Sequence, residues 1–382
     1  LGCNEFFSLI SNTCGGYTFY KDAKLLRLTR YRYNNVPADI NGKYLYIKDG
    51  DTVWNPGWQP TKTELDSYEC RHGIGYSRFT SSKNGVKASV LSFVPLNDNC
   101  EISQLTLTNG SSEDKKLSVF SYVEWCLWNA VDDSSNFQRN LSTGEVEIER
   151  ETDATLLYHK TEFKERRNHY AFYGVNAPVV GFDTSRDEFL GQFNGWDTPQ
   201  VIAEGKAHDS VAHGWFPIAA NRVRLELQPG ETASLVFMLG YIEVAKDQKW
   251  EDPNDPAKVG IINKKPAHEL FRRFATVEQV EAALTDVVEY LKAVDGFAHD
   301  VDVRRAVKDA FQSFPHDGVV VGNHNTYHRR AIRRREMCPG RLVAAGRVLI
   351  NEKHCHFNRN GRKFAFYLLC RQRRPPWPCD HL

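Results

Sequence analysis

Carboxylates in the first half of the sequence have the chemistry of acid–base catalysts. Glu124 could donate a proton as a general acid, and Asp132 with Asp133 forms an adjacent carboxylate pair. Neither pattern is specific enough to identify an active centre by itself. A nearby basic run at Arg27, Arg30 and Arg32 is most simply explained by residues that brace a loop or line an interface.

Aromatic side chains offer a second kind of chemistry, because they make up 12% of the residues. Four tryptophans could stack on the faces of pyranose rings, namely Trp54, Trp58, Trp125 and Trp128. Tryptophans in a large β-sandwich belong more often to the core or to an interface, so we predict that role.

Histidines and cysteines are the other reactive side chains. His72, His159 and His169 occur in strand-like or turn-like sequence without the spacing of metal ligands, which predicts hydrogen-bonded structural histidines and no metal site. Nine cysteines are present, and the first five are scattered without a CxxC pair. This pattern is typical of free thiols in a reducing cytoplasm.

The elements that position these residues are predicted to be mainly β-strands. Residues 1–262 alternate apolar and polar side chains in short runs separated by turns. The runs at 102–108 and 116–122 are joined by a turn at 109–112, and those at 223–227 and 235–241 by a turn at 229–231. We predict that each turn joins a pair of adjacent antiparallel strands, within a large antiparallel sandwich of two sheets.

Residues 263–294 change to helical periodicity, which predicts two linker helices that meet near Ala275. Thr276 and Gln279 have the spacing of a capping box at the start of the second helix. Short helices need a surface to pack on, and we expect their apolar face to lack its partner in this chain. The residues of that face are Leu270, Phe274, Val280, Leu284 and Leu291.

Residues 295–382 form an atypical, irregular tail that is rich in arginine, proline, cysteine and histidine. Such a composition is typical of translation in a wrong reading frame, or of a disordered segment. Two other interpretations stay open. The arginines could neutralise nucleic-acid phosphates, and the cysteines and histidines could bind zinc, although no pair has zinc-finger spacing.

Overall charge and hydropathy argue against two classes of partner. With Lys+Arg 49 against Asp+Glu 48 the formal net charge is +1, so the whole chain has no electrostatic attraction to nucleic acid or to an anionic membrane. No stretch approaches the roughly 20 apolar residues that span a bilayer. Because no export signal is visible and the sequence begins in a strand-like run, we expect Leu1 to be an internal point of a longer cytoplasmic protein.

Several long motifs in the β region resemble the cellobiose phosphorylases, inverting glycoside phosphorylases once grouped with the glycosyltransferases. The motifs are FFSLISNT (6–13), GGY (15–17), RLTRYRYNNVP (27–37), WNPGW (54–58), SYECRHG (67–73), EWCLWNA (124–130), NFQRN (136–140), YHKTE (158–162) and RRNHYAFY (166–173). Their order and spacing also match, and the resemblance extends from residue 1 to about residue 292.

The resemblance implies a β-supersandwich, a helical linker and an (α/α)6 barrel that holds the active centre. It implies reversible conversion of cellobiose and inorganic phosphate into α-glucose 1-phosphate and glucose, with phosphate as co-substrate and no cofactor. One carboxylic acid protonates the glycosidic oxygen while phosphate attacks the anomeric carbon from the opposite face. In the family this acid is an aspartate in a Gly-Phe-Arg-Asp-type segment of the barrel. The 382 residues contain no such segment, so we expect no catalytic residue in this chain and no activity from it alone.

The resemblance also assigns Gln138 and Arg139 to contacts with the acceptor glucose. A guanidinium fork and an amide present several donors in one plane, which suits vicinal sugar hydroxyls. Alternatively, Arg139 pairs with Asp132 or Asp133 to hold its own loop. Two hypotheses for the whole chain follow: an N-terminal phosphorylase domain that contributes to acceptor binding and to a homodimer, or a stand-alone, non-catalytic carbohydrate-binding or assembly domain.

Overall fold

A computed structural model describes residues 1–32, 39–40, 42–135, 145–150, 155–161, 168–214, 216–252, 254–258 and 260–300. These residues belong to one compact unit, Leu1–Val301. Nearly all of the predicted irregular tail, from residue 301 onward, lies outside the described residues.

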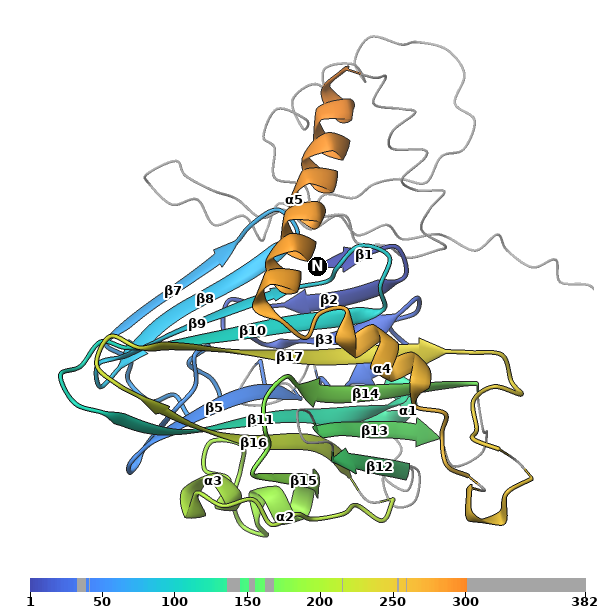
Figure 1. Cartoon of the computed structure of the whole chain (residues 1–382), viewed down its shortest axis with the longest axis horizontal. Helices are drawn as coiled ribbons and strands as arrows, with labels where there is room; N and C mark the ends of the chain where they lie inside the picture. The colour runs from blue at the N-terminus through green and yellow to red at the C-terminus, as the bar shows by residue number, and fades with distance from the viewer. Residues whose placement is uncertain are drawn as a thin grey trace, which may run out of the picture. The chain divides into compact units, whose positions relative to one another are not determined.

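Two large antiparallel sheets dominate the structure (Figure 1), which confirms the predicted fold class. Within the described residues the first sheet has nine strands and the second has eight. The nine-stranded sheet contains β1 (Gly2–Cys3), β2 (Phe6–Ile10), β3 (Gly16–Tyr20), β4 (Arg27–Thr29), β5 (Lys43–Asp49), β6 (Thr52–Trp54), β11 (Lys115–Trp128), β15 (Gly181–Ser185) and β16 (Pro217–Leu227). The eight-stranded sheet contains β7 (Ser67–His72), β8 (Tyr76–Lys83), β9 (Val86–Phe93), β10 (Cys100–Asn109), β12 (Glu145–Arg150), β13 (Thr155–Thr161), β14 (His169–Val175) and β17 (Thr232–Glu243).

The two predicted turns lead into strands at the expected places, but the predicted pairings are wrong. The turn after β10 leads into β11, and the turn after β16 leads into β17, and in both cases the two strands lie in different sheets. Instead β10 pairs with β17, with Leu105 opposite Leu235, and β11 pairs with β16, with Val119 opposite Val223. The turns therefore connect the two layers of the sandwich, and the apolar side of each strand faces the space between the sheets.

Each sheet is covered by helices on its outer face. The nine-stranded sheet is covered by α2 (Arg186–Leu190) and α3 (Gln200–Glu204), which pack on tyrosines such as Tyr46 and Tyr122. The strand-and-turn prediction did not include these short helices, or α1 (Ala130–Ser135), because a five- or six-residue helix carries no measurable period. A 3₁₀ turn at Pro256–Lys258 precedes the linker helices.

The outer face of the eight-stranded sheet is covered by the predicted linker helices, α4 (Lys265–Arg272) and α5 (Val277–Asp300) (Figure 1). The capping box is confirmed, because Gln279 N donates to Thr276 Oγ1 at 3.3 Å and Thr276 N donates to Gln279 Oε1 at 3.1 Å. The expectation that the apolar helix face lacks a partner is wrong. Leu270, Phe274 and Val280 are buried against the sheet, and Leu284 and Leu291 pack beside them.

Candidate functional site

The segment that carries the predicted sugar contacts, residues 136–144, lies outside the described residues, and Gln138 and Arg139 lie within it. Both of its neighbours are described, since α1 ends at Ser135 and β12 begins at Glu145. The described part of the candidate site is therefore the set of residues that holds α1 in place.

A buried ion-pair cluster of Arg30, Glu124, Asp133 and Arg186 holds α1 against the nine-stranded sheet. Arg30 donates from Nε and Nη2 to the two carboxylate oxygens of Asp133 in α1, at 2.7 and 2.6 Å. Arg30 Nη1 donates to Glu124 Oε1 in β11 at 2.6 Å, and Arg186 Nη1 of α2 donates to the same oxygen at 3.0 Å. Paired charge-assisted hydrogen bonds are strong and directional. Because a six-residue helix is not stable alone, the cluster fixes the place where the 136–144 segment begins.

Glu124 does not fit the role of a general acid. Its side chain is 2% exposed, and the Tyr122 hydroxyl donates to Oε2 at 3.0 Å. Burial alone would raise the pKa of this carboxyl, but the attraction of Arg30 and Arg186 outweighs it and lowers the pKa to about 2. Glu124 therefore remains ionised near neutral pH and has no proton to donate.

The adjacent carboxylates Asp132 and Asp133 do not form a catalytic pair. Asp133 is 3% exposed, and both of its oxygens accept hydrogen bonds from Arg30, which also confirms the bracing role predicted for that arginine. The alternative pairing of Arg139 with either aspartate involves a residue outside the described part of the chain.

The four tryptophans divide into two groups. Trp54, Trp125 and Trp128 are fully buried in the core between the sheets, which confirms the structural role predicted for them. Trp58 is 38% exposed, so it alone of these four presents part of its ring to solvent.

The three histidines are structural, but they differ in their hydrogen bonding. His72 Nδ1 lies 2.8 Å from Ser77 Oγ, and His169 Nδ1 lies 2.9 Å from the Tyr241 hydroxyl oxygen, as predicted for hydrogen-bonded histidines. His159 departs from that prediction, because neither ring nitrogen has a hydrogen-bond partner.

His159 is instead stacked against two tryptophans. Its ring centroid lies 5.6 Å from that of Trp125 and 5.3 Å from that of Trp128. Burial, followed by repulsion from Lys249 and Arg30, lowers the pKa of this imidazole to about 3. His159 is therefore a neutral aromatic spacer in the core.

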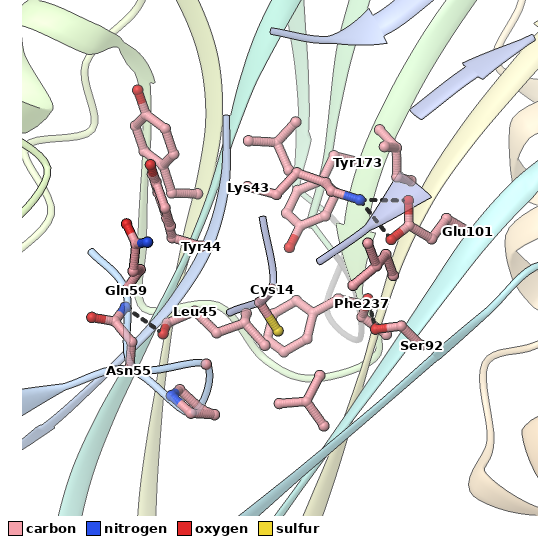
Figure 2. Close-up of a pocket in the computed structure, with 18 residues that line it drawn as sticks. Cys14, Lys43, Tyr44, Leu45, Asn55, Gln59, Ser92, Glu101, Tyr173 and Phe237 are labelled. Carbon is pink, nitrogen blue, oxygen red and sulfur yellow. Dashed lines mark hydrogen bonds and ion pairs between the residues drawn. The ribbon is translucent and has the colours of Figure 1, made fainter. Parts of the chain in front are cut away.

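A cavity of about 70 Å³, lined mainly by apolar atoms, lies between the sheets (Figure 2). Lys43 of β5 donates to both oxygens of Glu101 in β10, at 2.7 and 2.8 Å, so this ion pair joins the two sheets. Burial opposes ionisation of Glu101, but Lys43 outweighs it and the pKa is lowered. A water molecule needs about 10–15 Å³ of such space, so the cavity accommodates a few waters and is too small for a sugar ring.

Metal ligation finds no support in the described ranges, where no group of three or more His, Cys, Asp or Glu side chains could hold an ion. The five cysteines of these ranges form no disulfide bonds. The cysteines and histidines of the tail, which raised the zinc alternative, lie outside the described residues. Among the helices that are described, none is long and apolar enough to cross a membrane.

Sequence reasoning missed Arg186 and the Lys43–Glu101 pair. Arg186 lies 62 residues from Glu124, and Lys43 lies 58 residues from Glu101. For Lys43 and Glu101 the only available signal was a charged residue at a core-facing position of a strand, which indicates a buried partner but does not identify it.

The fold and the site together define a large, all-antiparallel β-supersandwich protein. Residues 1–277 match the family described as glycosyl hydrolase 94, supersandwich domain. The chain therefore belongs to the glycosyl hydrolase 94 family.

Characterised relatives of the chain include disaccharide phosphorylases. An N,N'-diacetylchitobiose phosphorylase from Vibrio furnissii is 31% identical over 246 residues, which are 63% of this chain and 30% of that protein. A solabiose phosphorylase from Paenibacillus borealis is 29% identical over 200 residues, 52% of this chain and 26% of that protein. A 3-O-beta-D-glucopyranosyl-beta-D-glucuronide phosphorylase from the same species is 26% identical over 216 residues, 55% of this chain and 27% of that protein. The chain thus spans less than a third of the length of these relatives.

Proposed function

We propose that this chain is the N-terminal domain of a cytoplasmic, homodimeric glycoside phosphorylase whose substrate is cellobiose. The observation that carries the proposal is the match of residues 1–277 to the glycosyl hydrolase 94 supersandwich domain, together with relatives that are disaccharide phosphorylases. The relatives differ in the sugar they act on. Cellobiose is proposed from the order and spacing of the motifs between residues 6 and 173.

The proposed contribution of this domain is binding of the acceptor sugar. Gln138 and Arg139 donate hydrogen bonds to hydroxyls of the acceptor glucose, and the Arg30–Asp133 pair anchors the helix that precedes them. The reaction also needs one carboxylic acid to protonate the glycosidic oxygen and phosphate to attack the anomeric carbon. Glu124 and Glu101 are buried and held ionised by cations, so neither supplies that proton. We propose that the acid belongs to a barrel domain that these 382 residues do not include.

Turnover and binding test the two parts of this proposal separately. Purified chain is incubated with α-glucose 1-phosphate and glucose, and phosphate release is followed beside a full-length family member. The expected result is no release from a sample whose circular dichroism shows folded β-structure. Release above background would place the general acid in this chain and contradict the proposal.

Acceptor binding is measured by titrating the chain with glucose in a calorimeter. Arg139→Met is expected to weaken glucose binding about 10- to 100-fold, because a hydrogen bond to a charged group contributes about 1.5–3 kcal/mol. Arg78→Gln, on the exposed side of β8, is the matched control and leaves binding unchanged. No saturable glucose binding, or equal affinity in Arg139→Met, would remove the acceptor role while leaving the family membership intact.

A further inference from the structure

Another buried arginine, Arg222 of β16, lies on the outer face of the nine-stranded sheet. Residues alternate along β16, so Arg222 shares this face with Ile218 and Ala220, whereas Ala219 and Val223 face the core between the sheets. Arg222 is 6% exposed, and its guanidinium carbon lies 5.4 Å from the centre of the Phe120 ring.

Arg222 has no acidic partner among the described residues. Its one side-chain hydrogen bond runs from Nη2 to Ser118 Oγ at 3.2 Å, and its Nε is buried without an acceptor. Burial, followed by repulsion from Arg224, lowers the pKa of the guanidinium. A buried charge without a counter-ion is costly, so this arrangement is completed most simply by an anion.

Two further cations lie beside Ser118, the residue that Arg222 contacts. Ser118 of β11 lies opposite Lys48 of β5 on one side and opposite Arg224 of β16 on the other, so the two cations flank the hydroxyl that Arg222 contacts. No carboxylate of the described residues forms an ion pair with Lys48 or Arg224. Glu226, which follows Arg224 by two residues in β16, forms an ion pair with Lys116 instead, at 3.8 Å.

The end of α3 fixes the position of the Lys48 side chain. Lys48 Nζ donates to the backbone oxygen of Ala203 at 3.3 Å. A Cβ on Gly205 would lie 3.1 Å from Lys48 Cε, so the backbone of this turn passes directly over the lysine side chain. Lys48 is thus held between the sheet surface and the α3 turn.

We propose that Arg222, Arg224, Lys48 and Ser118 form a binding site for a phosphate-type oxyanion. The two arginines offer planar forks that match the oxygens of a phosphate, Lys48 adds a point charge, and the Ser118 hydroxyl adds a donor. The patch is compact, because these residues come from three adjacent strands about 4.8 Å apart. Its size suits a small dianion better than an extended acidic segment.

The experiment is calorimetric titration of the 382-residue chain with inorganic phosphate, at an ionic strength held constant with sodium chloride. We expect saturable binding of one phosphate per chain. Arg222→Gln should weaken it about 10- to 100-fold, through loss of charge-assisted hydrogen bonds. Arg224→Gln, at an exposed position, should weaken it about threefold, and Arg222→Lys should fall between wild type and Arg222→Gln.

Arg78→Gln is again the control, because it removes one arginine charge from the surface of the other sheet. Circular dichroism verifies that each variant folds, and the exposed Arg224→Gln keeps the test valid if Arg222→Gln does not. Absence of saturable phosphate binding to wild type, or equal affinity in the Arg224 and Arg78 variants, overturns the proposal. Binding of a glutamate-rich peptide without binding of phosphate also overturns it, because the patch would then serve a protein partner. Neither sugar nor turnover enters this measurement, so its result does not depend on the proposed function.

Discussion

Arg30 and Arg222 are buried to the same extent and have opposite surroundings. Arg30 is 5% exposed and Arg222 is 6% exposed. Arg30 contacts two carboxylates through three hydrogen bonds, which raise its pKa despite the cost of burial. Arg222 contacts one hydroxyl and an aromatic ring beside another arginine, and its pKa is lowered.

The difference shows that burial alone does not define the role of a charged side chain. Where carboxylates of the same chain complete the charge balance, as at Arg30, the cluster is part of the architecture and positions α1. Where no carboxylate of the described residues forms an ion pair with the buried charge, as at Arg222, we infer that a ligand completes the charge balance. Stability measurements can separate these two cases.

The largest effect is expected from Arg30→Met. This change leaves Glu124 buried with one remaining ion-pair partner, Arg186, and leaves Asp133 buried with no ion-pair partner among the described residues. Removing one partner of a buried ion pair costs about 3–5 kcal/mol, so the free energy of unfolding in urea should fall by that amount. A loss below about 1 kcal/mol would mean that the cluster does not hold the fold together.

A second effect concerns His159, which is buried without any partner. Its pKa falls from the ordinary value of 6.5 to about 3, so between these values the folded state binds fewer protons than the unfolded state. The contribution of His159 to the free energy of unfolding is therefore complete above pH 6.5. As the pH falls from 6.5 towards 3, the free energy of unfolding decreases by about 1.4 kcal/mol per pH unit.

Urea unfolding between pH 7 and 5 measures this loss, because Glu124 starts to contribute only below its ordinary pKa of 4.5. His159→Phe preserves an aromatic ring in contact with Trp125 and Trp128 and should flatten the pH dependence. His72→Gln, at a histidine with a hydrogen bond to Ser77, is the matched control and should retain most of it. An unchanged slope in His159→Phe would show that another group binds the proton.

The smallest effect is expected from Arg222→Met in phosphate-free buffer. No carboxylate is left behind by this change, and the methionine side chain still covers Phe120. The free energy of unfolding should therefore stay within about 1 kcal/mol of wild type. A loss as large as that of Arg30→Met would erase the contrast between the two arginines and indicate a partner within the chain.

The sequence predicted features that depend on neighbouring residues. Alternation identified the strands around Leu105 and Phe237, and the spacing of Thr276 and Gln279 identified the helix start, because both patterns repeat within a few residues. The sheet in which each strand lies was not predictable in this way. A turn such as that at 109–112 reverses the chain equally well within one sheet or between two.

The candidate site was predictable to a lesser degree for the same reason. The NFQRN motif at 136–140 was identified by resemblance, but the anchor of the helix before it depends on Arg30 and Asp133, which are 103 residues apart. The core position of His159 was missed because stacking on Trp125 and Trp128 requires strands from both sheets. Local sequence indicates that a residue is buried and leaves open what it touches.

The pairing of β17 has a consequence for the order in which the protein can assemble during synthesis. β17 lies between β10 and β14, so until it leaves the ribosome the eight-stranded sheet exists only as two separate parts. Thr106 of β10 contacts Ser234, which is synthesised 128 residues later. Translation of those residues takes on the order of ten seconds at typical rates. During that time β10 has one open edge that can pair with a neighbouring nascent chain. We therefore expect the yield of folded protein to respond strongly to translation speed and to chaperones that shield strands.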